Sequence, residues 1–196
     1  MRVIAGIFRS RQLKSLRGLA LRPTSDRLRE TLFNVLQDRI EDSRFLDLFA
    51  GTGAVGIEAL SRGAKQAVFI EKHQPSAALI GKNLESLEIR SGARVLPMDA
   101  IRGLVKLAAE QSSGSPAFDI VFLDPPYAAA DEYEQVLSFL GDAPLLDPGS
   151  LVIAEHRRSF DLPETRGRLH TVRILQQGDA SLTFYTASPR EIPHSQ

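Results

Sequence analysis

Asp124, Pro125, Pro126 and Tyr127 follow directly on an apolar run, residues 118–123. A strand cannot continue through two prolines, because proline lacks the N–H that a neighbouring strand needs and its ring fixes φ. The turn therefore leaves a sheet at the carboxyl end of a strand, where open α/β sheets bind ligands. It offers a carboxylate, carbonyl oxygens and an aromatic ring, which suit an exocyclic amine of a nucleobase and stacking on that base. The alternative is a proline turn that ends a buried strand, with Tyr127 at its edge.

A glycine-rich motif lies earlier in the chain. Residues 51–56 read Gly-Thr-Gly-Ala-Val-Gly and match G-x-G-x-x-G between a predicted strand and a predicted helix, and Glu71 follows Gly51 at the spacing of a ribose-binding acid. This is the dinucleotide fingerprint, but the same layout serves any adenosine cofactor. The motif alone therefore does not identify the cofactor.

Two further acids favour S-adenosylmethionine over a dinucleotide. Asp47 comes just before the glycine loop, and at ~4 Å and an effective ε of ~20 it would repel a pyrophosphate charge by about 4 kcal/mol. It would instead attract the sulfonium and ammonium groups of S-adenosylmethionine. Asp99 can accept a hydrogen bond from the adenine amino group, with Met98 or Ala100 beside the ring. Taken singly, Asp99 can also be explained as the cap of the following helix.

Strand-like and helical segments alternate from residue 44 onward. This alternation predicts parallel βαβ units with helices on both faces of a mostly parallel sheet, and residues 169–176 and 181–187 predict a closing antiparallel hairpin. We therefore expect a Rossmann-like α/β fold with a seven-stranded sheet. The five earlier predicted strands are residues 45–49, 66–71, 94–98, 118–123 and 150–155, and the predicted helices between them are residues 56–62, 75–87, 100–109 and 131–141.

The N-terminal part of the chain is basic, although the 24 basic and 24 acidic residues of the chain balance. Residues 3–8 and 12–16 predict a small hairpin, and a helix with one apolar face follows from Thr24 or Ser25 to Ile40. Arg27, Arg29 and Glu30 lie largely off that face, so we expect them in solvent. Because residues 1–24 contain basic side chains and no acid, they suggest a polyanionic partner; a solvated basic terminus is the alternative.

Composition narrows the function classes. The chain of 196 residues contains no cysteine, which excludes a cysteine nucleophile, a Cys-ligated zinc site and a disulfide framework. No apolar run approaches the roughly 20 residues of a membrane span, and the short N-terminal apolar run does not resemble a signal peptide. We expect a cytoplasmic protein without a metal. Nothing in the sequence suggests an obligate dimer, so we expect a monomer.

These motifs, in this order, resemble the Rossmann-like amino-methyltransferases, and more closely the bacterial small-subunit (16S) rRNA guanine-N2-methyltransferase (RsmD) family. The resemblance covers roughly residues 2–187. Its broader part is the glycine loop, Glu71, Asp99-Ala100 and the Asp-Pro-Pro-Tyr turn. Its specific part comprises residues 2–6 (Arg-Val-Ile-Ala-Gly), 22–24 (Arg-Pro-Thr), 26–27 (Asp-Arg), 29–30 (Arg-Glu), 32–34 (Leu-Phe-Asn), 56–63 and the late hairpin at Gly178.

The resemblance implies S-adenosylmethionine-dependent methylation of the N2 amine of a guanine in ribosomal RNA, within a small-subunit particle. It implies an N-terminal RNA-contacting arm (residues 1–22), a methyltransferase domain (residues 23–187) and a tail (residues 188–196). The implied catalytic residues are Asp124, Pro125 and Tyr127. The implied cofactor residues are Asp47, Ala50, Gly51, Gly53, Glu71, Asp99 and Ala100. The implied RNA-binding residues are Arg9, Arg11, Lys14, Arg22 and Arg27.

Three other functions stay open from the residues alone. An adenine-N6-methyltransferase acting on DNA or RNA could use the same Asp-Pro-Pro-Tyr turn. A dehydrogenase could use the glycine loop, although Asp47 counts against it. A non-catalytic RNA-binding assembly factor would keep the basic arm but would leave Asp124 and Tyr127 without a purpose.

Overall fold

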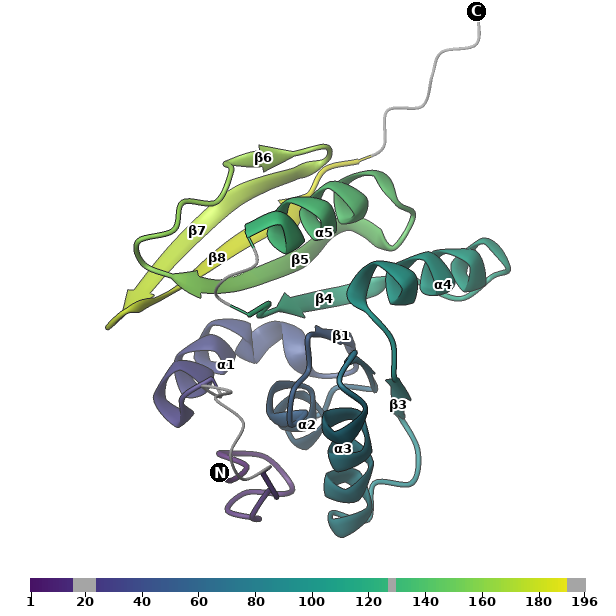
Figure 1. The fold of residues 1–196 in the computed structure, drawn as a ribbon, viewed down its shortest axis with the longest axis vertical. Coiled ribbons are helices and arrows are strands. Elements are labelled where there is room, and N and C mark those ends of the chain that lie inside the picture. Colours follow the sequence, from purple (N-terminus) through teal and green to yellow (C-terminus); the bar gives the residue numbers. More distant parts are fainter. Residues whose placement is uncertain (16–23, 127–129, 190–196) are drawn as a thin grey trace, which may run out of the picture.

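The computed structural model describes residues 1–15, 24–126 and 130–189. Its centre is a mixed eight-stranded sheet in the order β3-β2-β1-β4-β5-β8-β7-β6 (Figure 1). The first five strands in this order are mutually parallel, and the last three join the sheet antiparallel. The strands are β1 (Arg44–Leu48), β2 (Gln66–Ile70), β3 (Ala93–Leu96), β4 (Phe118–Leu123), β5 (Leu146–Arg157), β6 (Thr165–Arg166), β7 (Leu169–Gln177) and β8 (Ala180–Ala187).

Five helices cover the two faces of the sheet. They are α1 (Asp26–Ile40), α2 (Ala54–Ser61), α3 (Gln74–Ser86), α4 (Ala100–Ser112) and α5 (Ala130–Asp142). Side chains of α1, α2 and α3 share one buried cluster, and those of α4 and α5 share the other. Successive strand residues point to opposite faces, so Phe45 enters the first cluster and Leu46 the second.

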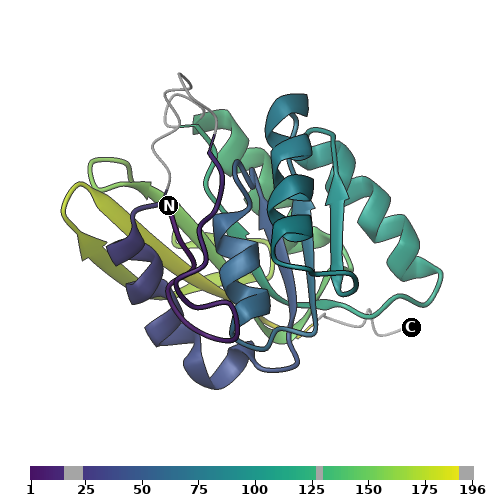
Figure 2. The ribbon, with the colours of Figure 1, turned by 90° about the horizontal axis from the view of Figure 1, so that it is seen from below.

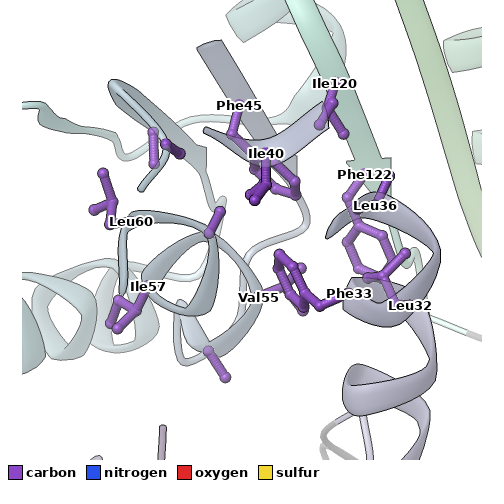
Figure 3. Close-up of a cluster of buried hydrophobic side chains, with 14 of the residues drawn as sticks. Leu32, Phe33, Leu36, Ile40, Phe45, Val55, Ile57, Leu60, Ile120 and Phe122 are labelled. Atoms are coloured by element: carbon purple, nitrogen blue, oxygen red, sulfur yellow. The ribbon is translucent and has the colours of Figure 1, made fainter. Parts of the chain in front are cut away.

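Helix α1 is built as its sequence pattern predicts. The hydroxyl of Ser25 accepts a hydrogen bond from the backbone N–H of Leu28 (3.1 Å) and caps the helix. The apolar face of α1 packs on the sheet (Figure 3), where the rings of Phe33 and Phe45 stack with centroids 6.3 Å apart. This packing fixes the position of α1 on the sheet.

The Rossmann-like α/β fold and the closing antiparallel strands are confirmed. The sheet has eight strands and not seven, because β6 contributes a two-residue strand. A strand of two residues is too short to show an alternation of apolar and polar residues, so no sequence pattern could predict it.

The predicted N-terminal β-hairpin is not shown as a pair of strands. Within residues 1–15 the structure has one isolated antiparallel bridge, between Arg2 and Gln12, and the first strand of the sheet follows α1. The backbone N–H of Val3 bonds to the carbonyl of Arg11 and that of Leu13 to the carbonyl of Met1, both at 3.0 Å. Other backbone groups of this segment bond to side chains of α2 and α3, beside which it lies (Figure 2).

Three buried polar side chains hold this N-terminal segment. The carboxylate of Glu58 accepts the backbone N–H groups of Ile4 (2.8 Å) and Ala5 (3.0 Å). Ser61 donates its hydroxyl hydrogen to the carbonyl of Ala5. The side chain of Asn83 accepts from the backbone N–H of Lys14 (2.8 Å) and donates to its carbonyl (3.2 Å). We conclude that residues 1–15 are packed onto the body of the protein.

Arg29 also belongs to this group, which corrects its predicted solvent exposure. Its side chain is fully buried and donates to the carbonyl of Arg2 (2.6 Å) and to Asp26 (3.0 Å). Its Nε lies 3.9 Å from Glu58. Burial lowers the pKa of Arg29 from its usual value, and the charge of Glu58 opposes that shift. The arginine therefore serves as a buried counter-charge, which an apolar-face pattern could not reveal.

Candidate active site

The candidate site lies at the carboxyl ends of β1 and β4. Strand order reverses between these two neighbours, since β2 and β3 continue on one side and β5 on the other. Loops that leave a parallel sheet at such a reversal diverge and leave room for a ligand. The β1–β4 register pairs Leu48 with Leu123. The glycine loop and the Asp-Pro-Pro turn therefore start from adjacent positions.

The glycine loop is a tight turn into α2. The carbonyl of Ala50 accepts the N–H of Gly53 at 2.7 Å, and Gly51 and Gly53 have positive φ angles of 55° and 77°. Gly56 lies one turn into α2, where a Cβ would come within 2.3 Å of the Phe69 ring. The glycines thus let the loop bend and let α2 lie directly on the sheet.

Glu71 fastens this loop. One carboxylate oxygen accepts the N–H of Gly51 (2.8 Å), and the other accepts the N–H of His73 (2.7 Å). Each oxygen retains a second lone pair, so Glu71 can hold the loop and still accept a ribose hydroxyl. The observed hydrogen bonds to the loop are therefore compatible with the predicted role of Glu71 in binding a ribose.

Asp47 lies beneath the loop. Its side chain is buried and accepts the N–H of Gly56 at 2.9 Å. Burial raises the pKa of Asp47 to about 7; the Gly56 hydrogen bond lowers it, and the nearby charge of Glu71 raises it further. A cation at this edge would favour the ionised carboxylate.

Asp99 and Ala100 begin α4 beyond β3. The carboxylate of Asp99 accepts the N–H of Arg102 (2.9 Å) and lies 3.5 Å from its guanidinium. This is the capping arrangement that the sequence left as an alternative, and Arg102 contacts both carboxylate oxygens. Ala100 is buried at the first position of the helix. Binding of adenine by these residues stays a prediction.

Asp124 and Pro125 follow directly on β4. Asp124 is partly buried and Pro125 is buried, whereas Tyr127 lies outside the described residues. Burial raises the pKa of Asp124 well above its usual value, and the charges of Glu155 and Asp47 raise it further. The turn thus places a proton-binding carboxyl group beside the glycine loop.

Glu155 is a site residue that the sequence patterns did not single out. The β4–β5 register pairs Leu123 with Ala154, so Asp124 and Glu155 are the next residues on adjacent strands. Glu155 accepts the hydroxyl hydrogen of Thr24 at 2.7 Å. One sequence feature could have indicated Glu155: it follows the apolar run 151–154, as the other acids of the site follow theirs.

The predicted RNA-binding residues are exposed where the structure describes them: Arg9, Arg11, Lys14 and Arg27. Arg11 also donates to the carbonyl of Ser86 (2.8 Å), which ties it to the end of α3. Arg9 and Arg27 face a shared surface groove between the N-terminal segment and α1, which Asp26 and Glu30 also line. Arg22 lies outside the described residues.

Neither a metal site nor a membrane span is found in the part of the chain that the structure describes. No three His, Asp or Glu side chains there gather in a way that could hold a metal ion. No described helix is both long and apolar enough to cross a membrane.

Comparison with known proteins places the chain in a family. The family model described as Conserved hypothetical protein 95 matches residues 1–186. The chain is 42% identical to the "Ribosomal RNA small subunit methyltransferase D" of Haemophilus influenzae, over 83% of this chain and 81% of that protein. It is 39% identical to the protein of the same name from Escherichia coli, over 90% and 86% of the two chains.

A solved structure extends the similarity to the whole fold. A hypothetical protein of Thermus thermophilus superposes with a TM-score of 0.78 and 31% identity, over 94% of this chain and 98% of that one. The chain therefore belongs to the Conserved hypothetical protein 95 family of RsmD-like methyltransferases, the family that its motifs resemble.

Proposed function

We propose that this protein transfers the methyl group of S-adenosylmethionine to the N2 amine of a guanine in small-subunit (16S) ribosomal RNA. The observation that carries this function is the pairing of β1 with β4, which places Asp124 next to the glycine loop. The names of the relatives at about 40% identity point to the same substrate.

Methyl transfer depends more on the alignment of the amine with the methyl group than on activation of either group. The lone pair of a guanine N2 amine is delocalised into the ring, so the amine is a poor nucleophile. Acceptors at Asp124 and at the carbonyl of Pro125 would bind its hydrogens and direct the lone pair at the methyl group. Since the sulfonium is already a good leaving group, alignment is the main contribution that the protein makes. Tyr127 would stack on the extruded base.

The cofactor would occupy the edge from β1 to β3. Ala50, Gly51 and Gly53 admit it close to the backbone. The remaining lone pairs of Glu71 suit the ribose hydroxyls, and Asp99 with Ala100 suits the adenine. Asp47, buried beneath the loop, contributes negative charge under the sulfonium and ammonium groups.

The basic N-terminal arm (residues 1–22) would contact the RNA backbone, with residues 23–187 as the methyltransferase domain and residues 188–196 as a tail. Exposed Arg9, Arg11, Lys14 and Arg27 support this interpretation, and Arg22 is proposed with them. We propose that the protein acts as a monomer in the cytoplasm, on RNA within a small-subunit particle.

Transfer of a labelled methyl group tests this function. The purified protein is incubated with S-adenosylmethionine and with small-subunit particles from cells that lack this gene, and the modified nucleosides are mapped. We expect N2-methylguanosine at one position, and more of it on particles than on naked RNA. N6-methyladenine in duplex DNA would favour the adenine methyltransferase, and binding without transfer would favour the assembly factor.

A further inference from the structure

Three segments that are far apart in the sequence meet at Asp124: the end of β4, strand β5 and the residues just before α1. Glu155 follows the last β4–β5 pair, Leu123 with Ala154, and therefore stands next to Asp124. Thr24, just before α1, donates its hydroxyl hydrogen to Glu155 at 2.7 Å. Thr24 and Glu155 are 8% and 3% exposed, so the contact is sealed from solvent and holds the carboxylate in one place.

The charged groups that act on Asp124 in the described part of the chain are acids. Glu155 approaches from β5 and Asp47 from β1, and both raise the pKa of Asp124 beyond the effect of burial. The hydroxyl of Tyr133, from α5, donates to the backbone carbonyl of Glu155 (2.6 Å). His156 is adjacent in sequence, but its ring bonds Thr183 on β8 (2.8 Å). The surroundings thus increase the proton affinity of Asp124.

The proposed reaction releases one proton from the amine. As the bond between N2 and the methyl carbon forms, the carbon–sulfur bond breaks and its electron pair stays on sulfur. The sulfonium becomes a neutral thioether, and the amine nitrogen carries the positive charge until it loses a hydrogen. A base within hydrogen-bond reach of the amine has to take that proton.

We propose that Glu155 is a positioning residue for this step: its carboxylate, held by Thr24, makes Asp124 the acceptor of the proton that the methylated amine loses. The inference rests on the proposed function and deepens it. Before transfer, the sulfonium charge keeps Asp124 ionised and able to accept hydrogen bonds from the amine. Transfer removes that charge, so Asp124 becomes more basic beside Glu155 as the amine becomes acidic. The proton then passes from the partly exposed Asp124 to water.

The pH dependence of a single turnover tests this role. Single-turnover methyl transfer to small-subunit particles is measured from about pH 5 to 9 for the wild type, Glu155→Gln and the control Asp38→Asn, an exposed acid on α1. The amide keeps the shape of the side chain and an acceptor for Thr24. The rate should fall at low pH as Asp124 becomes protonated, which gives the pH–rate profile an acid limb. A neighbouring like charge shifts a pKa by about one unit or more, so this limb should move about one pH unit lower in Glu155→Gln. The affinity for S-adenosylhomocysteine should stay within about threefold of the wild type.

Variants of Thr24 keep the test informative if Glu155→Gln does not fold. Thr24→Val removes a hydrogen bond to the ionised carboxylate, so it should move the limb in the same direction by less. Thr24→Ser restores the hydroxyl and should restore the wild-type profile. The inference would be overturned if the acid limb of Glu155→Gln stayed at the wild-type pH. If only Thr24→Val folds, an unchanged acid limb in that variant would overturn it. If the wild type itself transfers no methyl group to the particles, the proposed function is what fails.

Discussion

In the described part of the chain, buried carboxyl groups gather in two places, and the charged groups around them differ. Glu58, on α2, has Arg62 at 2.8 Å and Arg29 at 3.9 Å. Asp47 and Asp124, at the carboxyl edge of the sheet, have other acids as the described charges that act on them. The first group has its own counter-charges, whereas the second brings carboxyl groups together where β1 and β4 end.

This difference separates a structural role from a functional one. A buried charge is tolerated when cations and hydrogen-bond donors surround it, and its loss leaves those partners buried without it. Acids that raise one another's pKa are costly to ionise until a cation arrives. Glu58 therefore holds the N-terminal segment to the body. The acids at the edge are suited to a cofactor that brings a sulfonium and an ammonium group.

The largest expected effect on stability is at Glu58. Glu58→Gln should lower the free energy of unfolding by about 3–5 kcal/mol, because Arg62 would lose its ion pair and buried Arg29 would keep only Asp26 as a counter-charge. Urea titration monitored by circular dichroism measures this change. Glu30→Gln, an exposed acid one position after Arg29, is the control and should stay within about 0.5 kcal/mol of the wild type. Equal effects in the two variants would refute a structural role for Glu58.

Substitution of Asp47 should stabilise the protein, whereas substitution of Glu58 should destabilise it. Its pKa is about 7 in the folded protein, against an ordinary 3.8. The folded state therefore holds more protons than the unfolded state between these values, and its stability falls as the pH rises from about 4 to 7. Each such group contributes at most about 1.4 kcal/mol per pH unit. Asp47→Asn should remove this loss, so the variant should gain stability over the wild type across that range and keep the gain above pH 7.

Urea titrations of the cofactor-free protein at several pH values measure the gain at Asp47. A constant difference between Asp47→Asn and the wild type at every pH would contradict a buried titrating carboxyl. At pH 8 the same variant should bind S-adenosylmethionine more weakly than the wild type, which calorimetry can show. Stability and affinity thus move in opposite directions at Asp47.

The smallest effect on the folded protein is expected at the exposed N-terminal cations. Replacing Arg9, Arg11 and Lys14 with alanine should weaken RNA binding. It should also lower the slope of log affinity against log salt by about 0.7–0.9 for each phosphate that these side chains neutralise. Cofactor affinity should hardly change. Arg173→Ala, on the exposed β7, is the matched control. An unchanged salt slope in the triple variant would mean that these side chains are only a solvated surface.

Much of the fold could be predicted because its signals are local. The strand ends, the glycine motif and the prolines after Leu123 determine where the chain turns, and each depends on neighbouring residues. The burial of Arg29 depends on Glu58, which lies on another helix. The two predicted N-terminal strands are not shown for a similar reason, since side chains of α2 and α3 take part of the backbone hydrogen bonds of this segment.

The same distinction applies to the site. Asp47, Glu71 and Asp124 were found because each ends a strand next to a recognisable motif. Glu155 carries no motif, and its relation to Asp124 exists only through the register of β4 on β5. The contact of Thr24 with Glu155 spans 131 positions of the chain. Such contacts follow from tertiary packing, which a pattern of single residues does not contain.

The role of Asp124 in methyl transfer is measured by the single-turnover rate of Asp124→Ala. In the proposed reaction, the turn after β4 acts on the amine during methyl transfer, beside a cofactor held at the acidic edge. A contact that strengthens in the transition state should affect the rate far more than affinity. By analogy with the loss of an oxyanion-hole donor, we expect the rate to fall about 10²–10³-fold, with RNA and S-adenosylmethionine affinities nearly unchanged. Transfer at the wild-type rate by Asp124→Ala would contradict the account.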